Sequence, residues 1–267
     1  MEGPLVTINE VINLIKERGP EKLPEDTVDT FKSGNPTEPV RGIVVTFMAT
    51  WKVLERAASL GANLVITHEP TYYSGRDETA WLNGDALYAS KKAFIEKHGI
   101  TIWRFHDGWH RHRPDGILAG MAQKLGWDMN PDLSLQNVFS IPSQPVKSLA
   151  LWCKKQLDIE LVRVAGDIDA TCKKAGMLPG ASGGRRQIEL FQKHDIDVLI
   201  CGESPEWETC EYVRDSTDSG KKKALIVLGH ANSEEAGMEW FSERLRPLIP
   251  AQIPIIHLKA GDPFQYV

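Results

Sequence analysis

The chain has 267 residues, of which 42% are hydrophobic and 25% charged, as expected for a globular protein that can bury a sizeable core. Its formal net charge of −5 argues against a nucleic-acid-binding surface spread over the protein. No apolar run reaches the roughly 18 residues that a membrane-spanning helix needs, so we expect no association with a membrane.

The start of the chain and its cysteines both indicate a cytoplasmic protein. The first residues lack the basic start and the long apolar stretch of a signal peptide. Thr7 and Glu10 instead have the spacing of a capping box, which predicts a helix that ends at Gly19 and Pro20. The four cysteines show no CxxC spacing, and a chain of this length needs no disulfide bonds, so we expect reduced thiols.

Strands and helices alternate in the first part of the chain. This order, with elements of these lengths, predicts a largely parallel sheet with crossover helices. After a connection over residues 24–38, we expect strands over residues 42–48, 64–66 and 100–105, with helices over 51–60 and 85–98 between them.

The second part of the chain repeats this order. Residues 53–66 align without a gap with residues 187–200, and residues 102–110 align with residues 226–234. The identity is low, and chance similarity is the alternative explanation. A true repeat would give two related α/β units. Between the repeats we expect helices over 117–125 and 146–157, an irregular stretch over 128–145 and a strand over 160–165, and the last strand lies near residues 253–258.

Two predicted strands of the first repeat end in polar clusters. The strand at 64–66 is followed by His68 and Glu69, and the strand at 100–105 by His106, Asp107 and His110. The carboxyl ends of neighbouring parallel strands share one edge of a sheet, where ligands bind. These imidazoles and carboxylates are therefore candidate metal ligands or an acid/base pair, and solvated loop residues are the alternative.

The matching position of the second repeat holds His230 and Glu234. A carboxylate in the first turn of a helix also favours the helix dipole, which is the alternative reading of Glu234. Four residues apart across a strand-to-helix turn, the two side chains could instead reach one ion. Nitrogen and oxygen ligands suit zinc, iron, manganese, nickel or cobalt, and no nearby thiolate selects zinc.

Two further features of the second repeat could bear on function. Glu203 follows the strand that matches residues 64–66, and it could act as a general acid/base, bind a ligating histidine, or be a solvated loop residue. The Gly-rich stretch 178–187 carries Arg185 and Arg186 and could hold a phosphate, although it lacks Walker spacing and could be a plain strand-to-helix turn. We assign no role to the other four histidines, His98, His112, His194 and His257.

Taken together, these segments resemble the Nif-three-like family with a dinuclear metal centre, whose members are often called GTP cyclohydrolase 1 type 2 homologues. The resemblance extends over almost the whole chain. It rests on GANLVITHEP (61–70), RFHDGWH (104–110), VRVAGD (162–167), GASGG (180–184), DVLICGE (197–203), LGHANSEE (228–235) and GDPFQYV (261–267).

The resemblance implies a set of metal ligands with two departures from the family pattern. Glu69 stands where the family has the second of two adjacent histidines, and His110 stands where it has a ligating Asp. His230 and Glu234 match the last two ligands directly. The implied set is His68, Glu69, His110, His230 and Glu234, with Asp107 as a substitute for the displaced carboxylate, and Glu203 stands where the family commonly has Asp.

The family fold, carried over, is α/β, with two intertwined α/β domains built from an internal repeat. Their sheets are mostly parallel (mixed), and the metal site lies in the cleft between the domains. We expect the first domain to comprise residues 1–130 and 245–267, and the second to comprise residues 131–244. The resemblance also implies a homo-oligomer, often a hexamer.

The implied function is that of a metal-dependent hydrolase in which one or two divalent transition-metal ions activate a water molecule. Asp107 or Glu203 would move protons. The family name suggests a purine nucleotide as the small-molecule substrate. The alternative is a non-catalytic metal-binding scaffold or regulatory protein that acts through protein partners. The acidic balance of the chain disfavours binding to nucleic acid.

Overall fold

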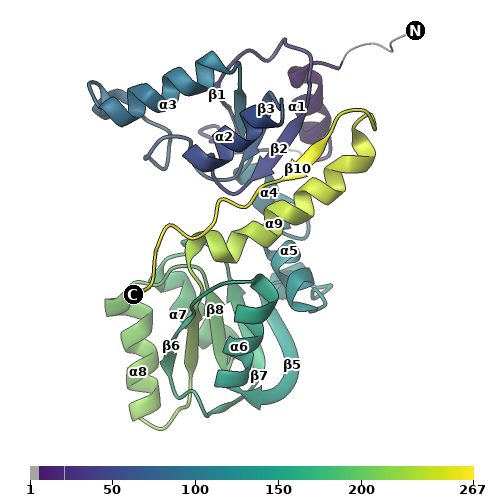
Figure 1. Cartoon of the computed structure of the whole chain (residues 1–267). Helices are drawn as coiled ribbons and strands as arrows, with labels where there is room; N and C mark the ends of the chain where they lie inside the picture. Colours follow the sequence, from purple (N-terminus) through teal and green to yellow (C-terminus); the bar gives the residue numbers. More distant parts are fainter. Residues whose placement is uncertain (1–5, 21) are drawn as a thin grey trace. The chain divides into compact units, whose positions relative to one another are not determined.

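A computed structural model describes residues 6–20 and 22–267 of the chain. They form two compact units, each assembled from separate stretches of sequence (Figure 1). The first unit comprises Met1–Gly116 and Met238–Ala260, and the second comprises Ile117–Gly237 and Gly261–Val267. The chain therefore passes from the first unit to the second and back again before it ends in the second.

The first unit contains a five-stranded sheet in the order β1-β4-β3-β2-β10. All neighbouring strands are parallel except β1, which runs antiparallel to β4 at the edge. Every residue of β2, β3 and β4 is buried, as in a sheet covered on both faces. The strands are β1 (Phe31–Ser33), β2 (Ile43–Thr46), β3 (Leu64–Thr67), β4 (Thr101–Arg104) and β10 (Ile255–His257).

The helices of the first unit include a five-residue helix, α4, directly after β4. Thr7 and Glu10 form the predicted capping box at the start of α1, whose apolar stripe is buried. The elements are α1 (Ile8–Glu17), α2 (Trp51–Ser59), α3 (Ala86–Lys97), α4 (Asp107–Arg111), the short helices η1 (Ala80–Leu82) and η4 (Arg246–Leu248), and the second half of α9 (His230–Leu245).

The second unit has a sheet of the same kind, in the order β5-β7-β8-β9-β6. Strands β7, β8 and β9 are parallel, and β5 and β6 run antiparallel at the two edges. The strands are β5 (Val138–Pro145), β6 (Arg163–Gly166), β7 (Thr171–Leu178), β8 (Val198–Cys201) and β9 (Ala224–Val227).

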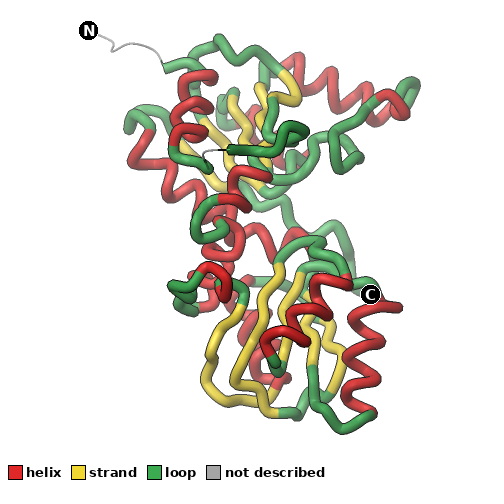
Figure 2. Tube along the Cα trace, turned by 180° about the vertical axis from the view of Figure 1, so that it is seen from behind, coloured by secondary structure: helices red, strands yellow, loops and turns green. Residues whose placement is uncertain are grey.

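Helices pack against this second sheet as well (Figure 2). Successive residues of β8 face opposite sides, so that Val198 and Ile200 belong to one apolar core and Leu199 and Cys201 to another. The helices are α5 (Gly116–Leu125), α6 (Val146–Leu157), α7 (Gly184–His194), α8 (Glu211–Asp218), the first half of α9, and the short η2 (Leu133–Leu135) and η3 (Glu206–Cys210).

The predicted α/β class with two mixed sheets is confirmed, and the parallel pairings predominate in the first sheet but make up only two of the four in the second. Strand order supports the repeat, because the parallel triplet β2-β3-β4 corresponds to β7-β8-β9 and an antiparallel strand lies beside both β4 and β9. Two expectations were wrong: residues 128–145 are not irregular throughout, since they contain β5, and the connection over 24–38 contains β1. None of the described helices is long and apolar enough to cross a membrane.

Candidate metal centre

His68 lies at the end of β3 and is fully buried. Its Nδ1 donates to the backbone oxygen of Phe105 at 3.0 Å, which leaves Nε2 as the nitrogen with a lone pair. Burial, followed by the neighbouring charges of His106 and His110, lowers the pKa of His68 well below its usual value. The ring is thus held neutral and in one orientation, which is the state that binds a metal ion.

Two more imidazoles come from the start and end of α4. The Nδ1 of His106 lies 2.9 Å from Asp107 Oδ1, and the Nδ1 of His110 lies 3.0 Å from Asp115 Oδ2. The ring of His106 stacks on that of His68 with the centroids 4.6 Å apart, and the Nε2 atoms of His68 and His110 are 3.2 Å apart. The three residues can each offer one nitrogen within 4.8 Å of the others.

The donor chemistry of these three histidines fits a divalent transition metal. In each ring Nδ1 is engaged by an oxygen acceptor, from Phe105, Asp107 or Asp115. Histidines that ligate metals almost always have their other nitrogen oriented in this way. The other nitrogen of each ring can then bind a shared ion, as a three-histidine metal site requires.

Asp29, which precedes β1, fixes the position of α4. Its carboxylate is 3% exposed and accepts hydrogen bonds from the amides of His106, Asp107 and Gly108 at 2.7–2.8 Å. A carboxylate at this end of a helix binds the unpaired amides and interacts favourably with the dipole. Asp29 therefore holds the helix that carries two of the three imidazoles.

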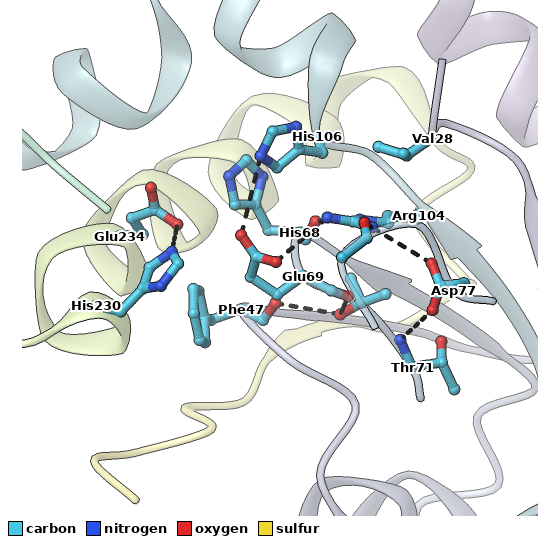
Figure 3. Close-up of polar contacts among 12 residues, drawn as sticks. Val28, Phe47, His68, Glu69, Thr71, Asp77, Arg104, His106, His230 and Glu234 are labelled. Atoms are coloured by element: carbon cyan, nitrogen blue, oxygen red, sulfur yellow. Dashed lines mark hydrogen bonds and ion pairs between the residues drawn. The ribbon is translucent and has the colours of Figure 1, made fainter. Parts of the chain in front are cut away.

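Glu69 is oriented by Arg104, the last residue of β4 (Figure 3). The Arg104 guanidinium donates from Nε to the His68 carbonyl at 3.0 Å and lies 3.2 Å from Glu69 Oε2. It also lies 3.3 Å from Asp77, which is 3.1 Å from Lys32. The other oxygen of Glu69, Oε1, lies 3.9 Å from His106 Nε2, so this carboxylate borders the histidine cluster.

Asp107, predicted as a proton-moving carboxylate, has both oxygens engaged. Oδ1 contacts His106, and Oδ2 accepts from the Thr27 hydroxyl at 2.9 Å and the Val28 amide at 3.2 Å. Burial acts to raise the pKa of Asp107, but the hydrogen bonds from His106, Thr27 and Val28 together hold it below its usual value. This geometry orients His106, and the catalytic role of Asp107 stays a prediction.

A second group of predicted residues lies in the second unit, around the start of α9. The imidazole of His230 lies between two carboxylates. Its Nε2 lies 3.2 Å from Glu234 Oε2 (Figure 3), and its Nδ1 lies 2.8 Å from Glu203 Oε1. The Glu234 side chain is 3% exposed, whereas that of Glu203 is 57% exposed. His230 and Glu234 thus place a nitrogen and an oxygen side by side as candidate metal ligands, and Glu203 contacts the other nitrogen of the imidazole.

The Gly-rich stretch 178–187 packs against this second group. Gly180 has a φ of +67°, and a Cβ atom on it would lie 2.1 Å from Glu234 Oε1. Its amide donates to the Ser233 hydroxyl at 2.9 Å, and its carbonyl accepts from the Glu203 amide at 2.9 Å. Arg185, which we considered for phosphate binding, pairs with Glu189 at 3.0 Å and is 93% exposed. The loop positions Glu203 and Glu234 by close backbone approach.

The structure thus groups the predicted residues by unit. His68, His106 and His110 form one cluster with Glu69 and Asp107 at its border, and His230, Glu234 and Glu203 form another. Sequence reasoning missed the residues that orient these side chains, because an isolated Asp or Arg shows no pattern. They are Asp29, Arg104 and Asp115.

Known proteins are similar to this chain in both sequence and fold. A family model described as Duf34/NIF3 (NGG1p interacting factor 3) matches residues 6–263. A Clostridium perfringens protein called GTP cyclohydrolase 1 type 2 homolog is 23% identical over 273 aligned residues, which cover 97% of this chain and 99% of the relative.

Solved structures agree with the sequence match. The chain resembles a hypothetical Staphylococcus aureus protein, SA1388, with a TM-score of 0.80 and 17% identity, covering 99% of this chain and 100% of the other. It also resembles a Bacillus cereus protein related to NIF3, with a TM-score of 0.78, 16% identity and the same coverage. At these identities the likeness establishes the fold.

Proposed function

Because the chain belongs to the Duf34/NIF3 family, we propose that it binds one or two divalent transition-metal ions and acts as a metal-dependent hydrolase. The observation that carries this proposal is the histidine cluster of the first unit. Its three rings offer ligand atoms within 4.8 Å of one another, and each ring is oriented through its other nitrogen. The curated relatives, which are called GTP cyclohydrolase 1 type 2 homologs, suggest a purine nucleotide as the first substrate to test.

The side chains present favour borderline metals. Imidazole nitrogens and carboxylate oxygens suit zinc, iron, manganese, nickel or cobalt. The proposed ligands are His68, His106 and His110 with Glu69 in the first unit, and His230 with Glu234 in the second. A bound ion of this kind would lower the pKa of a water molecule and polarise the substrate.

The surrounding carboxylates divide into orienting groups and one proton carrier. Glu203 is more than half exposed and lies 2.8 Å from His230 Nδ1, so it can exchange protons with solvent while it contacts the ring. Asp107 is enclosed by His106, Thr27 and Val28 and would act by holding His106. We therefore assign proton transfer to Glu203 in preference to Asp107.

The metal proposal is tested by elemental analysis of protein purified without chelators. We expect one or two equivalents of a transition metal per chain in the parent protein. His68→Ala combined with His110→Ala should lose at least one equivalent, because both rings are removed from the cluster. His98→Ala is the matched control, since His98 lies at the end of α3 and packs on Phe94. A parent protein that takes up no metal even when metal is offered would refute the proposal.

The second group is tested in the same way. His230→Ala combined with Glu234→Ala removes both donors at the start of α9, and comparison with the His68/His110 variant assigns the bound ions to residues. Glu203→Gln should keep the metal and lose turnover if Glu203 moves protons. Unchanged turnover in Glu203→Gln would remove that role from Glu203.

A non-catalytic metal-binding scaffold is the second candidate, and one observation favours it. Arg104 holds Glu69 Oε2 at 3.2 Å, so part of the predicted ligand set already has a cationic partner within the protein. Turnover of purine nucleotides that depends on metal supports the hydrolase. Metal that changes only the melting temperature or the assembly supports the scaffold. For both candidates we expect a cytoplasmic homo-oligomer, a hexamer by family resemblance, which sedimentation analysis can measure.

A further inference from the structure

The C-terminal tail, Gly261–Val267, belongs to the second unit, as does the first turn of α9. Asp262 connects the two segments. Its Oδ2 accepts from the Asn232 side-chain amide at 2.9 Å and from the Tyr266 hydroxyl at 2.7 Å, and its Oδ1 accepts from the Phe264 amide at 2.9 Å. A chain end is ordered only where contacts of this kind hold it, so the tail is fastened to the helix through Asp262.

Two residues on one face of α9 bind the tail. The Asn232 side chain donates to Asp262 and also to the Leu228 carbonyl at 2.8 Å, so it closes the turn between β9 and α9 as well. Glu235, three residues further on, accepts from the Gly261 amide at 3.2 Å. Because residues three apart lie on the same face of a helix, the tail contacts a single face of the first turn.

The Gly-rich loop holds the same turn through a different residue. The Ser233 hydroxyl accepts from the Gly180 amide at 2.9 Å and donates to the His230 carbonyl at 2.8 Å. His230 and Glu234, the proposed metal ligands of the second unit, stand on either side of Asn232 and Ser233 in the sequence. The two proposed ligands are therefore carried by a helix turn that is held at two points, by the loop and by the tail.

We infer that the C-terminal tail positions the metal-binding pair of the second unit, with Asp262 and Asn232 as the positioning residues. This inference rests on the proposed metal binding by His230 and Glu234. Residues that orient metal ligands without touching the ion typically contribute about 10–100-fold to its affinity. Asp262 acts through Asn232 and the backbone of the turn, so its contribution lies at the lower end of that range. The coupling is reciprocal, so an ion bound to the pair also holds the tail in place.

The inference is tested on the full chain by Co²⁺ titration, followed through the visible absorption of the bound ion, and by hydrogen exchange of the metal-free protein. The Co²⁺ signal that is lost in His230→Ala combined with Glu234→Ala defines the ion of the second unit. We expect Asp262→Ala to weaken binding of this ion about tenfold and to leave the ion of the histidine cluster unchanged. Without metal, the same variant should speed exchange of the amides of residues 231–236 about fivefold, because the turn opens more often.

Phe264→Ala is the matched control in the tail. It keeps the backbone amide that donates to Asp262, and the Phe264 side chain is 71% exposed, so neither measurement should change. Asp262→Asn keeps one of the two acceptor oxygens, and its effect should lie between those of Asp262→Ala and the parent.

Three results would overturn the inference. They are unchanged binding of the second-unit ion in Asp262→Ala, an equal effect of Phe264→Ala, and equal weakening of the ion at the histidine cluster, which would mean a general loss of structure. Failure of the proposed function gives a different result. The variant of His230 and Glu234 would then bind as many ions as the parent, and the exchange measurement alone would decide whether the tail fixes the turn.

Discussion

Replacement of Asp29 should destabilise the first unit far more than its position in a loop suggests. Its carboxylate accepts hydrogen bonds from three backbone amides at 2.7–2.8 Å, and the hydrogen bond from the Gly108 amide is buried. A buried donor left without an acceptor costs about 1–3 kcal/mol, and loss of a helix cap typically costs about 1 kcal/mol. Because water can reach the two part-buried amides, we expect Asp29→Ala to lower the free energy of unfolding by about 3 kcal/mol.

Asp29→Asn provides an internal check on this reasoning. Oδ1 accepts from His106 and Asp107, and Oδ2 accepts from Gly108. An amide oxygen can keep the first two bonds, while the amide nitrogen cannot accept the third. The loss for Asp29→Asn should therefore be about half of that for Asp29→Ala.

The assay is urea denaturation followed by circular dichroism, with Asp26→Ala as the control. Asp26 is an acid of the same loop whose side chain is 68% exposed and pairs with Arg76 at 2.9 Å. An exposed ion pair of this kind contributes about 0–1 kcal/mol. A loss for Asp29→Ala no larger than the loss for Asp26→Ala would refute the capping role.

Two further predictions concern other parts of the chain. Gly180→Ala would place a Cβ 2.1 Å from Glu234 Oε1, so it should lower the free energy of unfolding by more than about 2 kcal/mol in the same urea assay. Gly183 also has a positive φ but faces open space, so Gly183→Ala is the control and should cost about 1 kcal/mol. Burial lowers the pKa of Lys91 to about 8, so between about pH 8 and pH 10 the unfolded chain binds a proton that the folded chain has lost, and stability contributed by this residue rises with pH. Relative to Lys91→Met, we expect the parent and the exposed control Lys92→Met each to gain about 2 kcal/mol of stability over that window, because the opposing contribution of the buried cysteines is common to all three proteins. Equal pH profiles for all three would contradict this prediction.

The sequence predicted those helices and strands in which the apolar residues of the local pattern are also the residues buried in the structure. The capping box of Thr7 and Glu10 and the buried strand before His68 are of this kind. Strand β5 was missed because Pro142 and Pro145 argue against a strand, yet an edge strand tolerates proline since part of its backbone needs no partner. Strand β1 has only three residues and no apolar pattern of its own.

The residues that orient the site could not be found in this way, since they act across long separations in the sequence. Asp29 contacts amides 77 to 79 residues further on, and Arg104 contacts Glu69 across 35 residues. Pairing between strands brings these residues together: β1, which follows Asp29, pairs with β4, and Thr67 of β3 pairs with Arg104, so the ends of β3 and β4 lie level. A motif search identifies the histidines, and the topology identifies what holds them.

The same register explains how the chain accommodates a carboxylate at position 69, in a largely buried place beside the histidine cluster. A carboxylate in a site that is 12% exposed requires a compensating charge, and Arg104 supplies it from the neighbouring strand. Arg104 is compensated in turn by Asp77, which pairs with Lys32, so that positive and negative groups alternate and the four charges cancel. A neutral imidazole at position 69 would leave the buried guanidinium with one carboxylate fewer. The identities of residues 69 and 104 are therefore coupled by charge, and the glutamate is part of a balanced network at the border of the histidine cluster.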